Sequence, residues 1–234
     1  MIPTIPREDL PAISAAQMQK IIMQATGKYG LDGRLLIEHV GRNLVDLVTK
    51  FAPEGPILVV AGRGNNGSGG LAAARLLAAH DRQLWVVPTH EAENYSGTPR
   101  EQLEHLKHFR NVRIRTSLPK LKFACVLDAA IGTNLDGPPR GRTLDMIRVI
   151  NNLQGCCVIS LDAPTGIDVD DGSIPGSSVK ATMTLSVALP KRGINPGGRV
   201  GRLFVGDIGI PPVIYADLGL GSVHLPSFLV EITR

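Results

Sequence analysis

Residues 61–70 read AGRGNNGSGG and separate the apolar run PILVV at 56–60 from the alanine- and leucine-rich stretch LAAARLLAAH at 71–80. The apolar run predicts a buried strand and the second stretch predicts a helix, so the glycines lie at the turn between the two. They satisfy the spacing G-x-G-x-x-G, in which backbone amides and a helix N-terminus bind phosphate. A tight turn whose glycines adopt positive φ explains the same spacing.

Two asparagines within this turn favour the ligand-binding interpretation. Asn65 and Asn66 can donate amide hydrogens to phosphate oxygens and offer carbonyl oxygens to a cation, whereas a plain turn seldom needs both. The turn therefore predicts a phosphate-binding loop.

Similar apolar runs recur along the chain, in the order QLWVVP, FACVLDAA, CVISLDAP, TMTLSVALP and GRLFVGDIG. Runs that are apolar at nearly every position fit strands buried on both faces of a sheet. Helices are predicted between them, at GSGGLAAARLLAAH, TPREQLEHLKHF and GRTLDMIRVINNL. Because strands alternate with helices, the sequence predicts a three-layer α/β domain with a parallel sheet.

Two helices are predicted ahead of this alternating region. Ser14 and Gln17 have the spacing of a capping box, which opens the first helix. The second, GRLLIEHVGRNLVDLVTKF at residues 33–51, repeats apolar residues at helical spacing and so has a packing face. The sequence has no internal repeat or linker and its tail is short, so we expect residues 1–234 to form a single domain.

The composition excludes several classes of protein. Hydrophobic residues make up 43% of the sequence and charged residues 20%, and no window is apolar enough to cross a bilayer. The N-terminus lacks a signal-peptide pattern and three cysteines cannot form an even disulfide framework, so we expect a cytoplasmic location. The net charge of +4 comes from scattered lysines and arginines, which does not indicate a nucleic-acid partner.

Two aspartates end apolar runs at matching positions. Asp128 in FACVLDAA and Asp162 in CVISLDAP each precede a loop that contains glycine. Because the carboxyl ends of parallel strands meet at one edge of a sheet, we expect both carboxylates at a common ligand crevice; capping of a loop is the alternative. Lys191 and Arg192 follow another run, where they either bind an anion or face solvent.

A dehydrogenase is a further candidate function. Glu91, after QLWVVPTH, stands where a dinucleotide-dependent dehydrogenase places an acid on the ribose hydroxyls. The chain lacks a convincing arrangement of acid, base and substrate-binding arginine for hydride transfer, so we rank this function last.

Taken in order, the segments AGRGNNGSGG, VLDAAIGTNLDGPPRG, ISLDAPTGIDVDDG, KATMTLSVALPKRGI and VGDIGIP resemble the motifs of the YjeF N-terminal-domain family. The resemblance covers nearly the whole chain, from about Ile13 to Pro212. It implies a Rossmann-like three-layer α/β/α sandwich with a largely parallel sheet, and a homodimer. It also implies that the chain interconverts the R and S epimers of hydrated NADH and NADPH, the NAD(P)HX compounds.

The resemblance implies roles for individual residues. The ligand's phosphates are expected at Asn65, Asn66, Gly67, Ser68 and Gly69, and a covering loop at Gly132, Thr133, Asn134, Leu135, Asp136, Gly137 and Pro138. Asp162 is expected beside the reacting ring as the catalytic residue, because epimerisation at C6 develops positive charge near the ring nitrogen. A potassium ion is expected at Asn66, Asp128 and Thr165.

Some positions depart from the family's motifs. The family's loop is typically N-N-G-G-D-G, whereas Ser68 and Gly69 stand at its G-D positions, so one carboxylate is absent. The family's M-E-N-A-G is IEHVG, with His39 in place of asparagine, and Thr165 stands where serine is usual. The alternative function is therefore a catalytically inactive module that binds a nucleotide or a protein.

Overall fold

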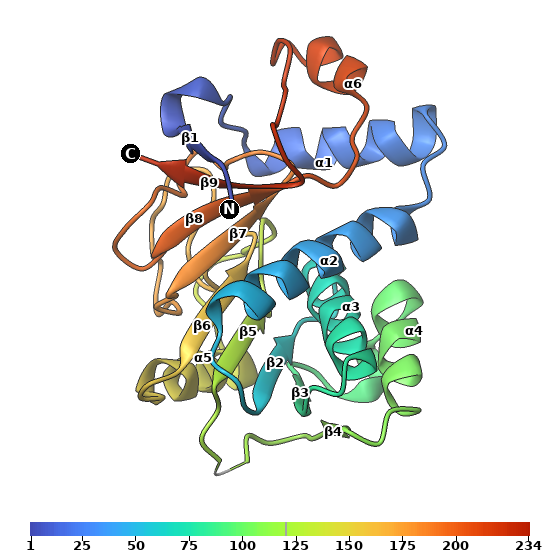
Figure 1. Ribbon diagram of the computed structural model, residues 1–234, viewed down its shortest axis with the longest axis vertical. Coiled ribbons are helices and arrows are strands. Elements are labelled where there is room, and N and C mark those ends of the chain that lie inside the picture. Colours follow the sequence, from blue (N-terminus) through green and yellow to red (C-terminus); the bar gives the residue numbers. More distant parts are fainter. Residues whose placement is uncertain (120) are drawn as a thin grey trace.

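The computed structural model describes residues 1–119 and 121–234, and its single sheet confirms the predicted α/β architecture. Nine strands are ordered β1-β9-β8-β7-β6-β5-β2-β3-β4 (Figure 1). The apolar runs form six of them: β2 (Ile57–Ala61), β3 (Leu84–Pro88), β5 (Cys125–Ala129), β6 (Cys157–Leu161), β7 (Met183–Val187) and β8 (Arg202–Gly206). All neighbouring strands are parallel except β8 and β9, so the sheet is largely parallel.

The other strands lie at the two edges of the sheet or next to one of them, and the sequence analysis does not predict them. They are β1 (Thr4–Pro6), β4 (Val112–Ile114) and β9 (Leu229–Thr233). Strand β9 pairs antiparallel with β8 and parallel with β1, so both ends of the chain lie at the same edge (Figure 1). Strands β1 and β4 have three residues each, too few to show a hydrophobic period.

The predicted helices are all present. They are α1 (Ala15–Met23), α2 (Gly33–Phe51), α3 (Asn65–Ala79), α4 (Gly97–Leu106) and α5 (Gly141–Asn152), and the structure adds α6 (Pro212–Asp217). A π-helical segment, Gln24–Lys28, continues α1, and short 3-10 helices span Arg7–Asp9 and Ala92–Asn94. The capping box is confirmed: Ser14 Oγ accepts a hydrogen bond from Gln17 N at 3.1 Å, and Gln17 Oε1 accepts one from Ser14 N at 3.0 Å.

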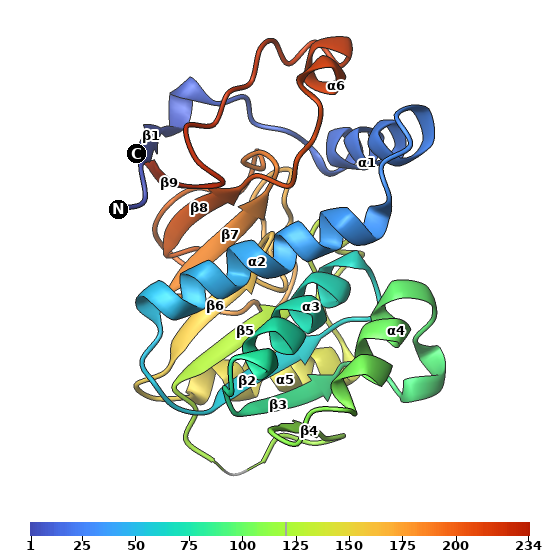
Figure 2. The ribbon, with the colours of Figure 1, turned by 45° about the vertical axis from the view of Figure 1, so that its right-hand side comes forward.

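The sheet is covered on both faces, as predicted. Helices α2, α3 and α4 cover one face, where they bury residues such as Val59 and Leu127, and α5 covers the other, where Ile147 packs with Leu58 and Val126 (Figure 2). Residues of β2 and β5 alternate between these two cores, which is why their strands are apolar at almost every position.

The strand order reverses between β2 and β5. From β2 the chain passes through α3 to β3 on one side, and it later returns to β5 on the other side of β2. Ligands of open α/β sheets bind outside the carboxyl ends of the strands at such a reversal. The topology therefore places the candidate site at the loops that follow β2, β5 and β6.

Helices α2 and α3 cross closely because small residues lie between them. A Cβ added at Gly69 would lie 2.6 Å from Val40 Cγ1 and 2.9 Å from Leu161 Cδ2. In the family motifs that the sequence resembles, M-E-N-A-G has alanine at the position of Val40 and N-N-G-G-D-G has aspartate at that of Gly69. The two positions that differ from the motifs are therefore neighbours in the structure. The larger side chain of Val40 fills the space that a side chain at position 69 would need.

We predict that Gly69→Asp lowers the free energy of unfolding by at least about 3 kcal/mol, because the new carboxylate meets Val40 and Leu161 in an apolar contact. The double variant Gly69→Asp/Val40→Ala should regain at least about 1 kcal/mol relative to the sum of the single changes. Urea unfolding of both single variants and the double variant measures this coupling. Strictly additive losses would show that Val40 does not occupy the aspartate's space.

Candidate active site at the carboxyl edge of the sheet

A cavity of about 1080 Å³ opens at the carboxyl ends of the central strands. Its walls come from α1, α2, the ends of β6 and β7 and the loops after β2, β3, β5, β6 and β8. They include Met18, Ile22, Leu36, Val40, Arg63, Asn65, Asn66, His90, Ile131, Gly132, Thr133, Asn134, Leu161, Asp162, Val187 and Ile208. The volume reaches the upper end of the range of roughly 300–1,000 Å³ that is typical of small-molecule sites. An extended ligand therefore has room in it.

Close backbone contacts explain the glycines of the first loop. A Cβ on Gly67 would lie 1.7 Å from Gly62 O, and a Cβ on Gly62 would lie 2.0 Å from Ala130 O. The alternative in which these glycines need positive φ is wrong, since neither adopts it and Gly64 has φ −104°. The contacts bring the start of α3 against the loop after β5.

Helix α3 begins at Asn65, and its N-cap residue is Gly64, which supplies no side-chain cap. The amides of the first turn are therefore left for another acceptor, and the helix dipole favours an anion at this end. Asn65 and Asn66 line the cavity. Gly67, Ser68 and Gly69 are buried in the first turns of α3, away from the cavity lining, and Ser68 Oγ donates to Gly64 O at 3.2 Å.

The loop after β5 contributes three of its seven expected residues to the cavity. Gly132, Thr133 and Asn134 line it, whereas Leu135, Asp136, Gly137 and Pro138 lie outside its lining. A Cβ on Gly132 would lie 2.8 Å from Asn66 Oδ1 and 3.1 Å from Asp162 Cβ. Glycine at 132 thus allows residues of three different loops to meet.

Asp128 and Thr165 are in direct contact below the cavity. Thr165 Oγ1 donates to Asp128 Oδ1 at 2.6 Å, while Thr165 N and Ser160 Oγ donate to Oδ2 at 2.9 and 2.8 Å. Burial raises the pKa of Asp128, and the hydrogen bonds from Thr165 and Ser160 act in the opposite direction. A cation nearby would favour the charged carboxylate.

These residues fit a potassium ion. Asn66 Nδ2 is buried without a hydrogen-bond partner among the described residues, and Asn66 Oδ1 lies against Gly132. The preceding residue, Ile131, donates its backbone N–H to Thr165 Oγ1 at 3.1 Å. Amide, carboxylate, hydroxyl and carbonyl oxygens therefore gather around Gly132 and Thr165, and such oxygens suit a hard cation.

Asp162 lies directly after β6 in an unusual backbone conformation. Its φ is +67°, in the left-handed region that few non-glycine residues adopt. Strand alternation would place Asp162 on the same face as Ser160, but the turn at Asp162 brings it into the cavity beside Leu161. Left-handed residues of this kind cluster at functional sites, where the surrounding structure maintains the strain.

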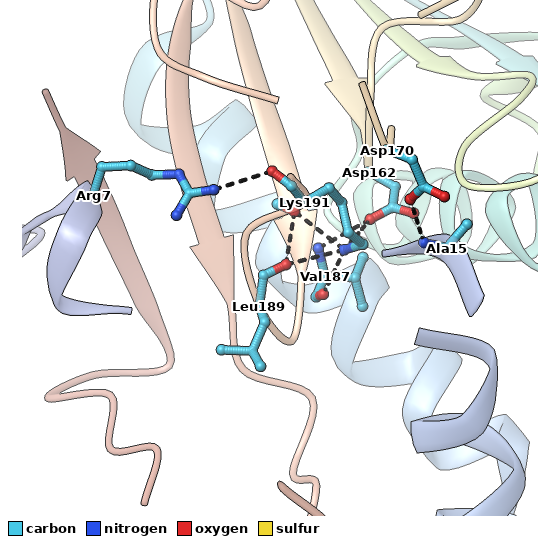
Figure 3. A network of polar contacts seen from close by, with 8 residues as sticks. Arg7, Ala15, Asp162, Asp170, Val187, Leu189 and Lys191 are labelled. Carbon is cyan, nitrogen blue, oxygen red and sulfur yellow. Dashed lines mark hydrogen bonds and ion pairs between the residues drawn. The ribbon is translucent and has the colours of Figure 1, made fainter. Parts of the chain in front are cut away.

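A buried lysine holds the Asp162 carboxylate (Figure 3). Lys191 Nζ lies 2.7 Å from Asp162 Oδ1 and also donates to Val187 O at 2.9 Å and Leu189 O at 3.0 Å. The Lys191 side chain has no exposed surface, so the solvent-facing alternative is wrong for Lys191, and the anion that it binds is a carboxylate of the protein. Arg192 is exposed and donates to Gln17 Oε1.

The two oxygens of Asp162 are in different situations. Oδ1 contacts Lys191 Nζ and accepts a weak hydrogen bond from Val187 N at 3.3 Å, whereas Oδ2 has no hydrogen bond to any residue that the structure describes. Apolar side chains of Leu161, Val187 and Ile208 surround this part of the cavity. A ligand cation would therefore meet a fixed carboxylate in a medium of low dielectric, where their attraction is strong.

The acid expected at a ribose is already paired. Glu91 follows β3 but is exposed, and its Oε1 accepts from Arg142 Nη1 at 3.1 Å. The cavity wall at this point is instead His90. Within residues 1–119 and 121–234, no helix is long and apolar enough to cross a membrane.

Comparison with known proteins agrees with this geometry. A profile of the family described as YjeF-related protein N-terminus matches residues 33–193. The NAD(P)H-hydrate epimerase of Truepera radiovictrix is 55% identical over 215 residues, which cover 92% of this chain and 97% of the relative. The NAD(P)H-hydrate epimerase of Dehalogenimonas lykanthroporepellens is 35% identical over 229 residues, which cover 94% and 92% of the two chains.

A solved structure shares the fold. The crystal structure of the yeast protein ynu0 (YNL200c) superposes with a TM-score of 0.80 at 22% identity, covering 95% of this chain and 100% of that one. The ordered motifs, the fold and the matched family profile lead to one conclusion: this chain belongs to the YjeF N-terminal-domain family.

Proposed function

We propose that this chain is an NAD(P)H-hydrate epimerase, which interconverts the R and S epimers of NADHX and NADPHX. The observation that carries the proposal is the Asp162 carboxylate, fixed through Oδ1 by a buried ammonium and lining a cavity next to a helix N-terminus. The two relatives of that name, 55% and 35% identical over almost the whole chain, support it.

The chemistry needs a negative charge at the reacting ring. When the C6–O bond breaks, the hydroxyl group takes a proton and leaves as water, while the lone pair of the ring nitrogen forms a C6=N double bond that carries positive charge. Water then adds to the other face of C6 and releases a proton. Asp162 stabilises this cation, and it can carry the proton if the ring opens instead. Lys191 keeps the carboxylate in place during both steps.

The structure gives no support to the inactive module. Asp162, Asp128 and Thr165 are present with their contacts, and the missing loop aspartate is replaced by a filled apolar contact between Gly69 and Val40. His39 is exposed on α2 and lies outside the cavity lining. Glu91, the candidate ribose-binding acid of a dehydrogenase, is exposed and lies outside the cavity lining.

We predict that the wild-type protein converts purified R-NADPHX into the S epimer faster than the spontaneous reaction, and that Asp162→Asn lowers this rate by about 10²–10⁴-fold. Asparagine tolerates the left-handed backbone and can still accept from Lys191 Nζ, so ligand binding should persist. Chromatographic separation of the epimers over time gives the rate, and calorimetry with NADPH gives the binding.

Asp145→Asn is the matched control, because Asp145 is an exposed carboxylate on α5, on the other face of the sheet. It should leave the rate unchanged. Equal rates for Asp162→Asn and wild type would show that Asp162 is not catalytic. A wild-type rate no higher than the spontaneous one would disprove the proposed activity.

A potassium ion belongs to the same proposal. Asn66, Asp128 and Thr165 would hold it, and it would offset carboxylate charge and fix the loops around Gly132. The position of Asn66 Oδ1 against Gly132 and the buried Asp128 carboxylate support this assignment.

The potassium site can be tested through stability. We predict a higher melting temperature in potassium chloride than in tetramethylammonium chloride at equal ionic strength, because a bound ion stabilises the folded state. Asn66→Ala should abolish that difference, since it removes one oxygen ligand, whereas Asn152→Ala at the exposed end of α5 should retain it. The same difference in all three proteins would argue against a site at Asn66.

A homodimer and a cytoplasmic location complete the proposal. Met23 on α1 and Leu35 on α2 are exposed to 64% and 58%, and both helices lie outside the alternating βα region, where they can meet a partner. We expect twice the chain mass in sedimentation equilibrium; a monomer mass at every concentration would contradict the dimer.

A further inference from the structure

Two basic side chains lie at the far end of the cavity from Asp162 and have no role in the chemistry above. Arg63 follows β2 and His90 follows β3, and both line the cavity. Along the carboxyl edge the strands are ordered β6, β5, β2, β3, so Asp162 and His90 stand at opposite ends of this row. With a strand spacing of about 4.8 Å, the row spans roughly 14 Å.

The backbone at His90 is held in place by a buried tyrosine. Tyr95 Oη donates to Ala61 O at 2.7 Å and accepts from Thr89 N at 3.1 Å, which ties the ends of β2 and β3 together. Thr89 Oγ1 lies 2.9 Å from His90 Nδ1. The other ring nitrogen, Nε2, has no hydrogen bond within the described part of the chain, and it remains available to a ligand.

The guanidinium of Arg63 lacks an anionic partner within the described part of the chain. Arg63 forms no ion pair or hydrogen bond with the residues described. The nearby carboxylate of Glu91 is engaged with Arg142. Burial lowers the pKa of His90, and the positive charges of Arg63 and Arg142 lower it further. A bound anion would relieve this repulsion.

The arrangement of the site indicates which anion this is. The N-terminus of α3, in the middle of the row, suits the pyrophosphate of a dinucleotide. If the reduced ring lies at Asp162, the adenosine ribose lies beyond the pyrophosphate, at β3. In dinucleotide-binding folds, the side chain that follows the second strand of the βαβ unit, here β3, contacts the ribose 2′ position. An acid there binds the 2′-hydroxyl, and an arginine nearby accommodates a 2′-phosphate.

We propose that Arg63 and His90 form a subsite for the 2′-phosphate of the adenosine ribose, so that the site favours NADPHX over NADHX. The subsite rests on the proposed function only for the direction of the ligand; binding of the phosphate requires no turnover. Its two residues come from different loops, and both line the same cavity.

Calorimetry with two small probes isolates this subsite. Adenosine 2′,5′-bisphosphate carries the 2′-phosphate and adenosine 5′-monophosphate does not. We expect the wild-type protein to bind the bisphosphate about tenfold or more tightly than the monophosphate, as a charge-assisted contact would give. Arg63→Ala should lower the affinity for the bisphosphate by about 10-fold to 100-fold and the affinity for the monophosphate by less than about threefold.

Arg148→Ala is the control, since Arg148 lies on α5 across the sheet and pairs with Asp145. It should leave both affinities unchanged. Because Arg63 is exposed and without a described partner, its replacement should not change the melting temperature. That measurement separates a lost contact from a lost fold.

Three results would overturn the subsite. The first is equal wild-type affinity for the two probes, and the second is no binding of the bisphosphate at millimolar concentration. The third is an equal loss of affinity for both probes in Arg63→Ala, which would place Arg63 at the 5′-phosphate. Failure of the proposed function looks different. In that case the protein would discriminate between the probes and yet would not exchange the epimers of NADPHX.

Discussion

The buried ion pair between Lys191 and Asp162 is the interaction on which the rest of the site depends. Truncating either side chain to alanine would leave the other charge buried without a partner, which costs about 3–5 kcal/mol. The residues on either side of Lys191 are hydrogen-bonded outside the cavity: Ile13 N donates to Pro190 O at 2.9 Å, and Arg192 N donates to Ile13 O at 3.1 Å. The segment that carries Lys191 thus anchors the start of α1, whose Met18 and Ile22 form a wall of the cavity.

A parallel sheet explains how residues distant in sequence form one site. Asp162, Gly132, Asn66 and His90 follow four neighbouring strands, and each loop leaves the same edge of the sheet. Each loop along this edge therefore contributes a different group to ligand binding. The loop after β6 supplies the carboxylate that stabilises charge, the loop after β5 a glycine that allows close contact, the loop after β2 the phosphate-binding amides, and the loop after β3 a basic side chain. Close contacts at Gly62, Gly67 and Gly132 set the spacing of these loops.

Features with a strong local signal could be predicted from the sequence. The bounds of α2 and the capping box at Ser14 follow from helical spacing and cap chemistry, and the six central strands from runs that are apolar throughout. Placing Asp128 and Asp162 at one edge needed only the parallel topology.

The remainder depends on tertiary contacts. Lys191 has no local feature that identifies its partner, because Asp162 lies on another loop. Positive φ at Asp162 breaks the alternation that predicts side-chain direction. From the sequence, glycine at position 69 indicates only that a carboxylate is missing. The structure shows that Val40 occupies the space beside Gly69, so the packing between α2 and α3 differs as well. Strand β9 is recognisable through its pairing with β8 and β1.

We expect a dinucleotide to lie along the carboxyl edge, with its reduced ring at β6 and its adenosine at β3. A crystal structure of the complex with NADPH tests this orientation most directly. We predict the ring in van der Waals contact with Asp162, at about 4 Å or less, and the pyrophosphate at the first turn of α3. A ligand bound in the reverse direction, or outside the cavity, would contradict this arrangement.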